Sequence, residues 1–240
     1  MTSLRVDVWS DIACPWCWVG KRNLEQALGE LGHAVDVRWH AFELDPSAPV
    51  KPPTEIDYVG RLATKYGTSR SEAQEMIDRM VRFGAERGIE FRFDRAQPSN
   101  TFDAHRLLAF AAGRGLQSEL KERLLRAYLN EGRCIAGGDV LVELAEEVGL
   151  DPDEARAVIS SDAYAKQVRE DESLAAEVGI TGVPFFVVGG RFAVAGAQPP
   201  EVLAEALSNA AAVSADSEDE ATDADACGPE GCDLPTGRAR

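Results

Sequence analysis

Residues 4–17 read Leu-Arg-Val-Asp-Val-Trp-Ser-Asp-Ile-Ala-Cys-Pro-Trp-Cys and end in two cysteines, Cys14 and Cys17, two positions apart. Residues 4–9 alternate in character as a strand does, and residues 19–31 carry apolar side chains at helical spacing. The cysteines therefore fall where a strand passes into a helix. The free N–H groups of a helix N-terminus stabilise a thiolate. We expect Cys14 to be an exposed nucleophile with a lowered pKa and Cys17 to be the resolving thiol behind it.

Cysteines at this spacing also occur in zinc sites, which need four ligands. No second Cys-x-x-Cys and no His-x-x-x-His follows in the sequence, and His33, His40 and His105 are scattered. Redox chemistry is therefore favoured and no metal is expected, while a buried structural pair of thiols stays open.

The order of the remaining segments predicts an α/β protein with a helical insertion. A second strand at residues 35–42 follows the first helix, and a helical crossover favours a parallel pair. We expect His40 to be an ordinary residue on the polar face of this strand. After a proline-rich loop the pattern is helical as far as about residue 178, apart from an extended piece expected at residues 89–93. Strands at 183–188 and 191–196, joined by Gly189-Gly190, then lead to a helix ending near Asn209.

Three stretches resemble one known family. They are Ser-Asp-Ile-Ala-Cys-Pro-Trp-Cys-Trp-Val-Gly at residues 10–20, Ser-Asn-Thr-Phe-Asp-Ala-His-Arg-Leu at 99–107, and Gly-Val-Pro-Phe-Phe at 182–186. They resemble DsbA-like disulfide oxidoreductases, most closely the FrnE type, over roughly residues 4–208. The broader family includes 2-hydroxychromene-2-carboxylate isomerase and kappa-class glutathione transferases, which typically have serine where this chain has Cys14.

This resemblance implies an α/β fold, a thioredoxin fold interrupted by an all-helical insertion domain. The expected boundaries are a first thioredoxin part at residues 1–55, the insertion at 56–178, a second thioredoxin part at 179–210, and a disordered acidic tail at 211–240.

The resemblance also implies residues around the two thiols. Val183–Pro184 is expected to be a cis bond that faces the cysteines and offers the Val183 backbone to a substrate. In the relatives the segment with Asn100 lies near the cleft, so Asn100 would be a further substrate contact. Trp16 and Trp18 flank the thiols and would give an apolar landing surface, with Trp18 equally a core residue, and Pro15 and Trp16 are expected to contact substrate. Asp11 is interpreted as a turn or capping residue, with tuning of the thiol or movement of a proton as the alternative.

The composition limits partners and location. A formal net charge of −16 argues against nucleic acid, which needs clustered Lys and Arg, and against anionic membranes. There is no run of about 18 apolar residues, and the few residues before the first strand do not resemble a signal peptide. A cytoplasmic location is therefore expected, where a Cys-x-x-Cys is more often catalytic than structural.

The last segment carries a second pair of cysteines. Residues 214–240 contain eight acidic and two basic residues and few large apolar ones, a composition typical of disorder. Cys227 and Cys232 enclose Gly-Pro-Glu-Gly, and we expect them to form an accessory redox pair for Cys14 and Cys17. An inert tail or a weak metal clip is the alternative.

The function expected from the sequence is thiol–disulfide exchange through Cys14 and Cys17, with a protein or small-molecule disulfide as substrate and a separate redox partner. No cofactor is expected, with glutathione kept open as a co-substrate. One alternative is a glutathione-dependent isomerase or transferase, against which the presence of Cys14 argues. The other is a non-enzymatic thiol- or metal-binding or chaperone-like protein.

Overall fold

The computed structural model describes residues 4–31, 34–51 and 57–223, with side chains up to residue 213. Cys227 and Cys232 lie outside the described residues, so their accessory role stays a prediction. Within the described part, no helix is long and apolar enough to cross a membrane.

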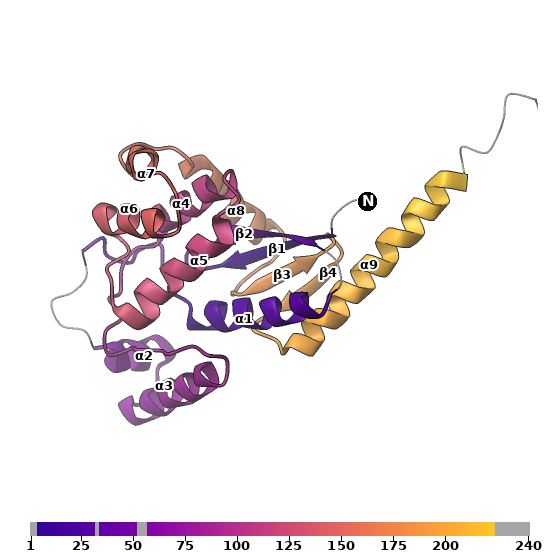
Figure 1. The fold of residues 1–240 in the computed structure, drawn as a ribbon. Coiled ribbons are helices and arrows are strands. Elements are labelled where there is room, and N and C mark those ends of the chain that lie inside the picture. The colour runs from indigo at the N-terminus through magenta and orange to yellow at the C-terminus, as the bar shows by residue number, and fades with distance from the viewer. Residues whose placement is uncertain (1–3, 32–33, 52–56, 224–240) are drawn as a thin grey trace, which may run out of the picture.

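The described residues form a four-stranded sheet at the centre of the protein (Figure 1). Its strands are β1 (Leu4–Ser10), β2 (Val35–Ala41), β3 (Phe185–Val188) and β4 (Phe192–Ala195), in the order β2-β1-β3-β4. β1 and β2 are parallel and are joined by helix α1 (Pro15–Glu30), whereas β3 pairs antiparallel with both β1 and β4. Gly189 and Gly190, at φ +59° and +68°, make the tight turn between β3 and β4. The expected thioredoxin-type order is confirmed.

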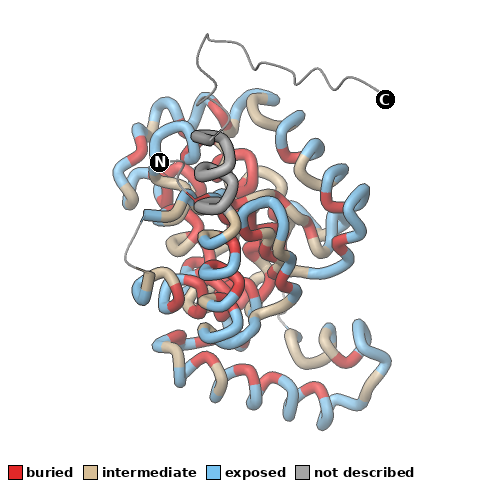
Figure 2. The backbone as a smooth tube through the Cα atoms, turned by 90° about the vertical axis from the view of Figure 1, so that its right-hand side faces the viewer, coloured by how far each residue is buried: buried red, intermediate tan, exposed pale blue. Residues whose placement is uncertain are grey.

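Helices α1 and α9 cover one face of the sheet. Apolar residues at alternate strand positions point to this face because successive side chains of a strand point to opposite sides. The core between them contains Val6, Val8, Leu24, Phe186, Val188, Leu203 and Leu207. Figure 2 shows that buried residues concentrate in the middle of the molecule, around this sheet and the helices next to it.

The chain between β2 and β3 is helical, as predicted. Its helices are α2 (Tyr58–Tyr66), α3 (Arg70–Ala85), α4 (Phe102–Ala112), α5 (Gln117–Arg126) with a π-helical turn at Ala127–Glu131, α6 (Gly138–Glu147), α7 (Pro152–Ile159) and α8 (Ala165–Glu177). Asp151 caps α7 through the N–H groups of Asp153 and Glu154, and Ser69 begins α3 with a capping box.

One expectation about the elements is wrong and one is met in part. Residues 89–93 alternate in burial as an extended piece does, with Ile89, Phe91 and Phe93 buried and Glu90 exposed, but they join no sheet in the described part. Helix α9 (Pro200–Asp223) also continues past Asn209 into the segment expected to be disordered. Alanines follow directly, at positions 210–212, and alanine is the strongest helix former.

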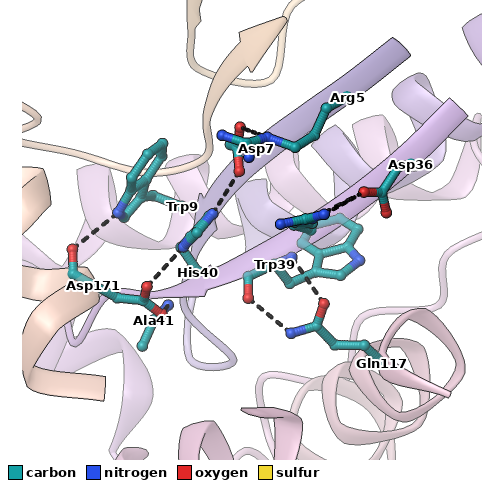
Figure 3. A network of polar contacts seen from close by, with 10 residues as sticks. Arg5, Asp7, Trp9, Asp36, Trp39, His40, Ala41, Gln117 and Asp171 are labelled. Carbon is teal, nitrogen blue, oxygen red and sulfur yellow. Dashed lines mark hydrogen bonds and ion pairs between the residues drawn. The ribbon is translucent and has the colours of Figure 1, made fainter. Parts of the chain in front are cut away.

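Side chains close the outer edge of β2. Figure 3 shows the Gln117 amide beside Trp39, where it accepts from the backbone N–H at 3.0 Å and donates to the backbone carbonyl at 2.9 Å. The Ala41 N–H donates to Oδ2 of Asp171 on α8 at 2.9 Å. These contacts occupy backbone groups that would otherwise be open to another strand. They also hold α5 and α8 against the sheet.

Candidate active site

The two thiols lie at the start of α1, as predicted. Cys14 is the N-cap residue and Pro15 occupies the first turn, where proline is tolerated because it has no N–H to leave unpaired. The Cys17 N–H donates to the Cys14 carbonyl at 3.1 Å. Cys14 is only 4 % exposed and Cys17 is fully buried, so the expectation of an exposed nucleophile is wrong in degree. The Val183 carbonyl lies against the Cys14 sulfur and helps to cover it.

Val183 and Pro184 lie against the first cysteine. Cys14 Sγ lies 3.5 Å from the Val183 carbonyl oxygen, to which its S–H donates, although the two residues are 169 positions apart. The Val183–Pro184 peptide bond is cis, as the resemblance implied. Pro184 is buried and packs on α1 beside Gly20, where a Cβ would lie 2.8 Å from Cγ of Pro184.

The close approach at Gly20 gives a testable prediction. Gly20→Ala should lower the free energy of unfolding by about 1–3 kcal/mol, because the added methyl group has no room beside Pro184. The control is Gly29→Ala on the same helix, where nothing lies within 4 Å of the added Cβ. That control should be neutral or slightly stabilising, since alanine favours a helix over glycine. Denaturant unfolding measures both; equal values for the two variants would contradict the packing described here.

A buried polar cluster lies directly beneath the two thiols. Lys121 on α5 is fully buried, and its Nζ donates to the Ser10 carbonyl at 3.3 Å. Asp11 is 1 % exposed, accepts from the Leu44 N–H at 2.8 Å, and lies 3.3 Å from Nε2 of His105. Burial lowers the pKa of Lys121 to about 8, although the negative charges of Cys17 and Asp11 oppose that fall. Burial would raise the pKa of Asp11, but His105 outweighs it, so the pKa is lowered and Asp11 is a carboxylate at neutral pH.

This environment shifts the pKa values of the two thiols in opposite directions. The contact with the Cys17 thiol, together with burial, raises the pKa of Cys14 well above the ordinary thiol value. Burial would also raise the pKa of Cys17, but the contact with the Cys14 thiol and the charge of Lys121 outweigh it and lower that pKa. The expectation that Cys14 has the lowered pKa is therefore wrong for this conformation. The N-terminus of α1 stabilises a thiolate at either sulfur, and the charge of Lys121 adds to this at Cys17, the inner one.

A cavity of about 1280 Å³ opens beside Cys14, beneath the hairpin of α2 and α3. Cys14, Pro15 and Trp16 line it, but Cys17 does not. Trp16 is 44 % exposed and its ring contacts Phe83 edge-on, with 5.5 Å between ring centroids. Trp16 therefore offers an apolar surface beside the thiols, whereas Trp18 is 3 % exposed and lies in the core, the other interpretation that the sequence left open.

Asn100 does not line this cavity. Its Oδ1 accepts from the N–H of Phe102, the first residue of α4, at 2.9 Å, and its Nδ2 donates to Glu43 and to the Pro46 carbonyl. The structure thus uses Asn100 to hold a loop against α4. Asp11 has the expected turn role, since its Oδ1 accepts from the Ala13 N–H at 3.4 Å, and it also belongs to the buried cluster.

Sequence reasoning missed Lys121 and His105. A signal for Lys121 was present, because it precedes Leu125 by four positions and Tyr128 by seven, which places it on the apolar stripe of α5. A lysine in such a stripe is buried only where a negative group lies nearby. Among the described residues, no group of three or more His, Cys, Asp or Glu side chains is placed to hold a metal ion.

The comparisons agree with this geometry. A family model described as a DSBA-like thioredoxin domain matches residues 5–208. The chain is 31 % identical to the uncharacterized protein YwbO of Bacillus subtilis (strain 168) over 209 residues, covering 86 % of this chain and 97 % of that protein. The crystal structure of a probable DsbA oxidoreductase from Streptomyces coelicolor is 38 % identical, with a TM-score of 0.79 over 97 % of this chain and 100 % of that one.

A more distant structure shares the fold. The cytosolic disulfide reductase DsbM of Pseudomonas aeruginosa is 22 % identical, with a TM-score of 0.60 over 88 % of this chain and 100 % of that one. The strand order, the helical insertion, the cysteine pair at the start of α1 and the family match over residues 5–208 lead to one assignment. The chain belongs to the family of DSBA-like thioredoxin-domain proteins.

Proposed function

We propose that the protein is a thiol–disulfide oxidoreductase that acts through Cys14 and Cys17. The observation that carries this proposal is the placement of the two sulfurs: Cys14 lines the cavity, and Cys17 lies behind it near the buried charge of Lys121. A thiolate is the nucleophile in disulfide exchange, so a buried cation next to the pair favours the reactive form.

The two sulfurs have different roles in the reduction of a disulfide. The Cys14 proton passes to the Cys17 thiolate, and the Cys14 thiolate attacks one substrate sulfur. A Cys14–substrate disulfide forms, the substrate S–S bond breaks, and the leaving sulfur takes the proton from Cys17. Cys17, again a thiolate, then attacks Cys14 and releases the second substrate sulfur, which takes a proton from water. Two electrons pass from the dithiol to the substrate; oxidation of a substrate dithiol is the same sequence reversed.

The rival isomerase or transferase function receives less support. Its relatives resemble this chain but typically have serine at the position of Cys14, and a serine hydroxyl forms no disulfide. Glutathione remains a candidate electron donor that regenerates the dithiol, and a cytoplasmic location is part of the proposal. Cell fractionation with antibody detection tests the location; recovery of the protein from an extracytoplasmic fraction would contradict it.

The experiment that tests the function is a trap for the mixed disulfide. In Cys17→Ser the second step is blocked, so Cys14 should stay joined to its substrate. A disulfide-containing peptide is added to the reduced variant, and the adduct is located by mass spectrometry after acid quenching. The matched control is Cys14→Ser, which keeps one thiol at the site but places it outside the cavity. An adduct on Cys134 instead of Cys14, or equal adducts in the two variants, would remove the proposed role of the pair.

Lys121 gives a second prediction for this function. Lys121→Met keeps most of the side-chain volume and removes the charge, so the thiolate titration should move to higher pH. The rate of exchange falls less than the thiolate fraction does, because a more basic thiolate is a better nucleophile. For this reason a tenfold loss of thiolate slows the reaction only about threefold.

Thiolate absorbance near 240 nm and a pH–rate profile measure the change at Lys121. Lys121→Arg, which retains the charge, is the control and should keep the titration of the original protein if it folds. An unchanged titration in Lys121→Met would show that the lysine does not act on the thiols.

A further inference from the structure

The cavity beneath α2 and α3 differs in charge from the protein as a whole. The chain has a formal net charge of −16, yet Arg61, Lys65 and Arg79 line this cavity. None of these three has a carboxylate partner among the described residues. Arg61 and Lys65 are one helical turn apart on α2, so they lie on the same face of that helix.

The carboxylates that line the same cavity are already engaged. Asp57 pairs with Arg70, with 2.6 Å between Oδ2 and Nη1, and Asp11 lies against His105 in the buried cluster. Asp45 accepts from the N–H and hydroxyl of Ser47, which carry no charge, so its negative charge remains. The lining has four cations and three carboxylates, a formal excess of one positive charge: Arg61, Lys65, Arg70 and Arg79 against Asp11, Asp45 and Asp57.

The charge of Arg61 acts on two tyrosines that line the cavity. Burial raises the pKa of Tyr58 and of Tyr128, and the positive charge of Arg61 opposes the rise at both. Both rings line the cavity together with Phe93 and Trp16. Arg61 thus lies beside an aromatic wall, a surface on which apolar and aromatic side chains of a ligand would pack.

The size of the cavity indicates the kind of ligand. Small-molecule sites usually measure about 300–1,000 Å³, and the cavity of about 1280 Å³ exceeds that range. At physiological salt, charges beyond about 8 Å are largely screened, so the local cations outweigh the distant acids of the chain. Figure 1 shows α2 and α3 as a separate pair at the bottom of the molecule, next to the start of α1.

We propose that this cavity selects substrates in which the disulfide lies in an extended peptide with acidic residues beside apolar ones. This inference rests on the proposed oxidoreductase function and specifies its substrate class. The peptide disulfide reaches Cys14, its apolar side chains pack on Trp16 and the tyrosines, and its carboxylates pair with Arg61, Lys65 and Arg79. The chemical step is the exchange already described, with two electrons from the Cys14–Cys17 dithiol.

The test compares three synthetic peptides that share one internal disulfide and the same apolar residues. They differ only in flanking residues, which are aspartate, serine or lysine. Reduced protein is mixed with each peptide in a single turnover, and the second-order rate constant is read from a fluorophore released from its quencher. The aspartate peptide should react about tenfold faster than the lysine peptide at low salt, and the ratio should fall in 0.5 M NaCl.

Charge reversal supplies the decisive comparison. The triple variant Arg61→Glu/Lys65→Glu/Arg79→Glu should reverse the order of the acidic and basic peptides. The control Arg156→Glu/Lys166→Glu/Arg191→Glu makes the same change in net charge at residues that do not line the cavity. It should keep the original order, and circular dichroism checks the fold of both variants.

The outcomes separate this inference from the function on which it rests. Equal rates for the three peptides with the original protein, or the same loss in both triple variants, would overturn charge selection and leave the oxidoreductase proposal standing. No reaction with any peptide would instead contradict the oxidoreductase proposal itself.

Discussion

Cys14→Ser is expected to lower the rate of disulfide reduction by at least about a thousandfold, because a serine hydroxyl is not ionised near neutral pH and cannot form a disulfide. The fully buried Cys17 cannot take over, since it does not line the cavity that a substrate would enter. Reduction of insulin or of a peptide disulfide, with dithiothreitol as electron donor and the uncatalysed rate subtracted, measures the loss.

The control for this loss is Cys134→Ser. Cys134 is a partly exposed thiol in the loop before α6 and does not line the cavity, so its removal should leave the rate within about twofold. Retained activity in Cys14→Ser, or a loss of equal size in Cys134→Ser, would move the reactive thiol away from the start of α1.

The strand, the cysteine pair and the helix that form this site could be predicted from the sequence. A strand, two cysteines with a proline between them, and an amphipathic helix are local signals, and each depends on residues close together in the chain. The parallel pairing of β1 and β2 followed from the helix between them. The place of Val183 and Pro184 beside Cys14 came from the family resemblance, since no local signal joins residues 169 positions apart.

The electrostatics of the site were not predictable in the same way. Lys121 lies on a helix of the insertion and acts on Cys17 only because α5 packs against the sheet and α1. The two thiol pKa values differ first through the contact between the sulfurs and then, at Cys17, through this charge, which the motif does not contain. In the same way, Asn100 was read from its motif as a substrate contact, whereas the fold supplies Glu43 and Pro46 as its partners.

His40 has a structural role that the sequence did not predict. It lies on the polar face of β2, as expected, but each ring nitrogen faces a carboxylate (Figure 3). Nδ1 lies 2.7 Å from Oδ1 of Asp171 on α8, and Nε2 lies 2.8 Å from Oδ1 of Asp7 on β1. Its ring also stacks on Trp9, with 4.5 Å between centroids. This histidine therefore joins two strands to the last helix of the insertion.

The protonated form of His40 should contribute to stability. Burial alone would lower the pKa of His40, but the two aspartates outweigh it and raise the pKa to about 9 from an ordinary value of 6.5. A group whose pKa is raised by folding stabilises the protein fully below the unfolded pKa, and the contribution is lost as pH rises through the folded pKa. The window of loss for His40 thus runs from about pH 6.5 to about pH 9, and its size is about 3 kcal/mol.

His40→Phe should lower the free energy of unfolding by about 3 kcal/mol at pH 6, since the ring still stacks on Trp9 but the buried Asp7 and the half-buried Asp171 lose their shared cation. At pH 10 the original protein has lost most of the same contribution, so the difference between the two proteins should shrink. Urea unfolding of both proteins from pH 6 to pH 10 measures this difference, in which the titration of the thiols and of Lys121 cancels. Adding Asp171→Asn to His40→Phe should recover part of the stability by removing one of the facing charges. A difference that stays constant across this range would mean that His40 acts through packing, and that its proton does not hold α8 to the sheet.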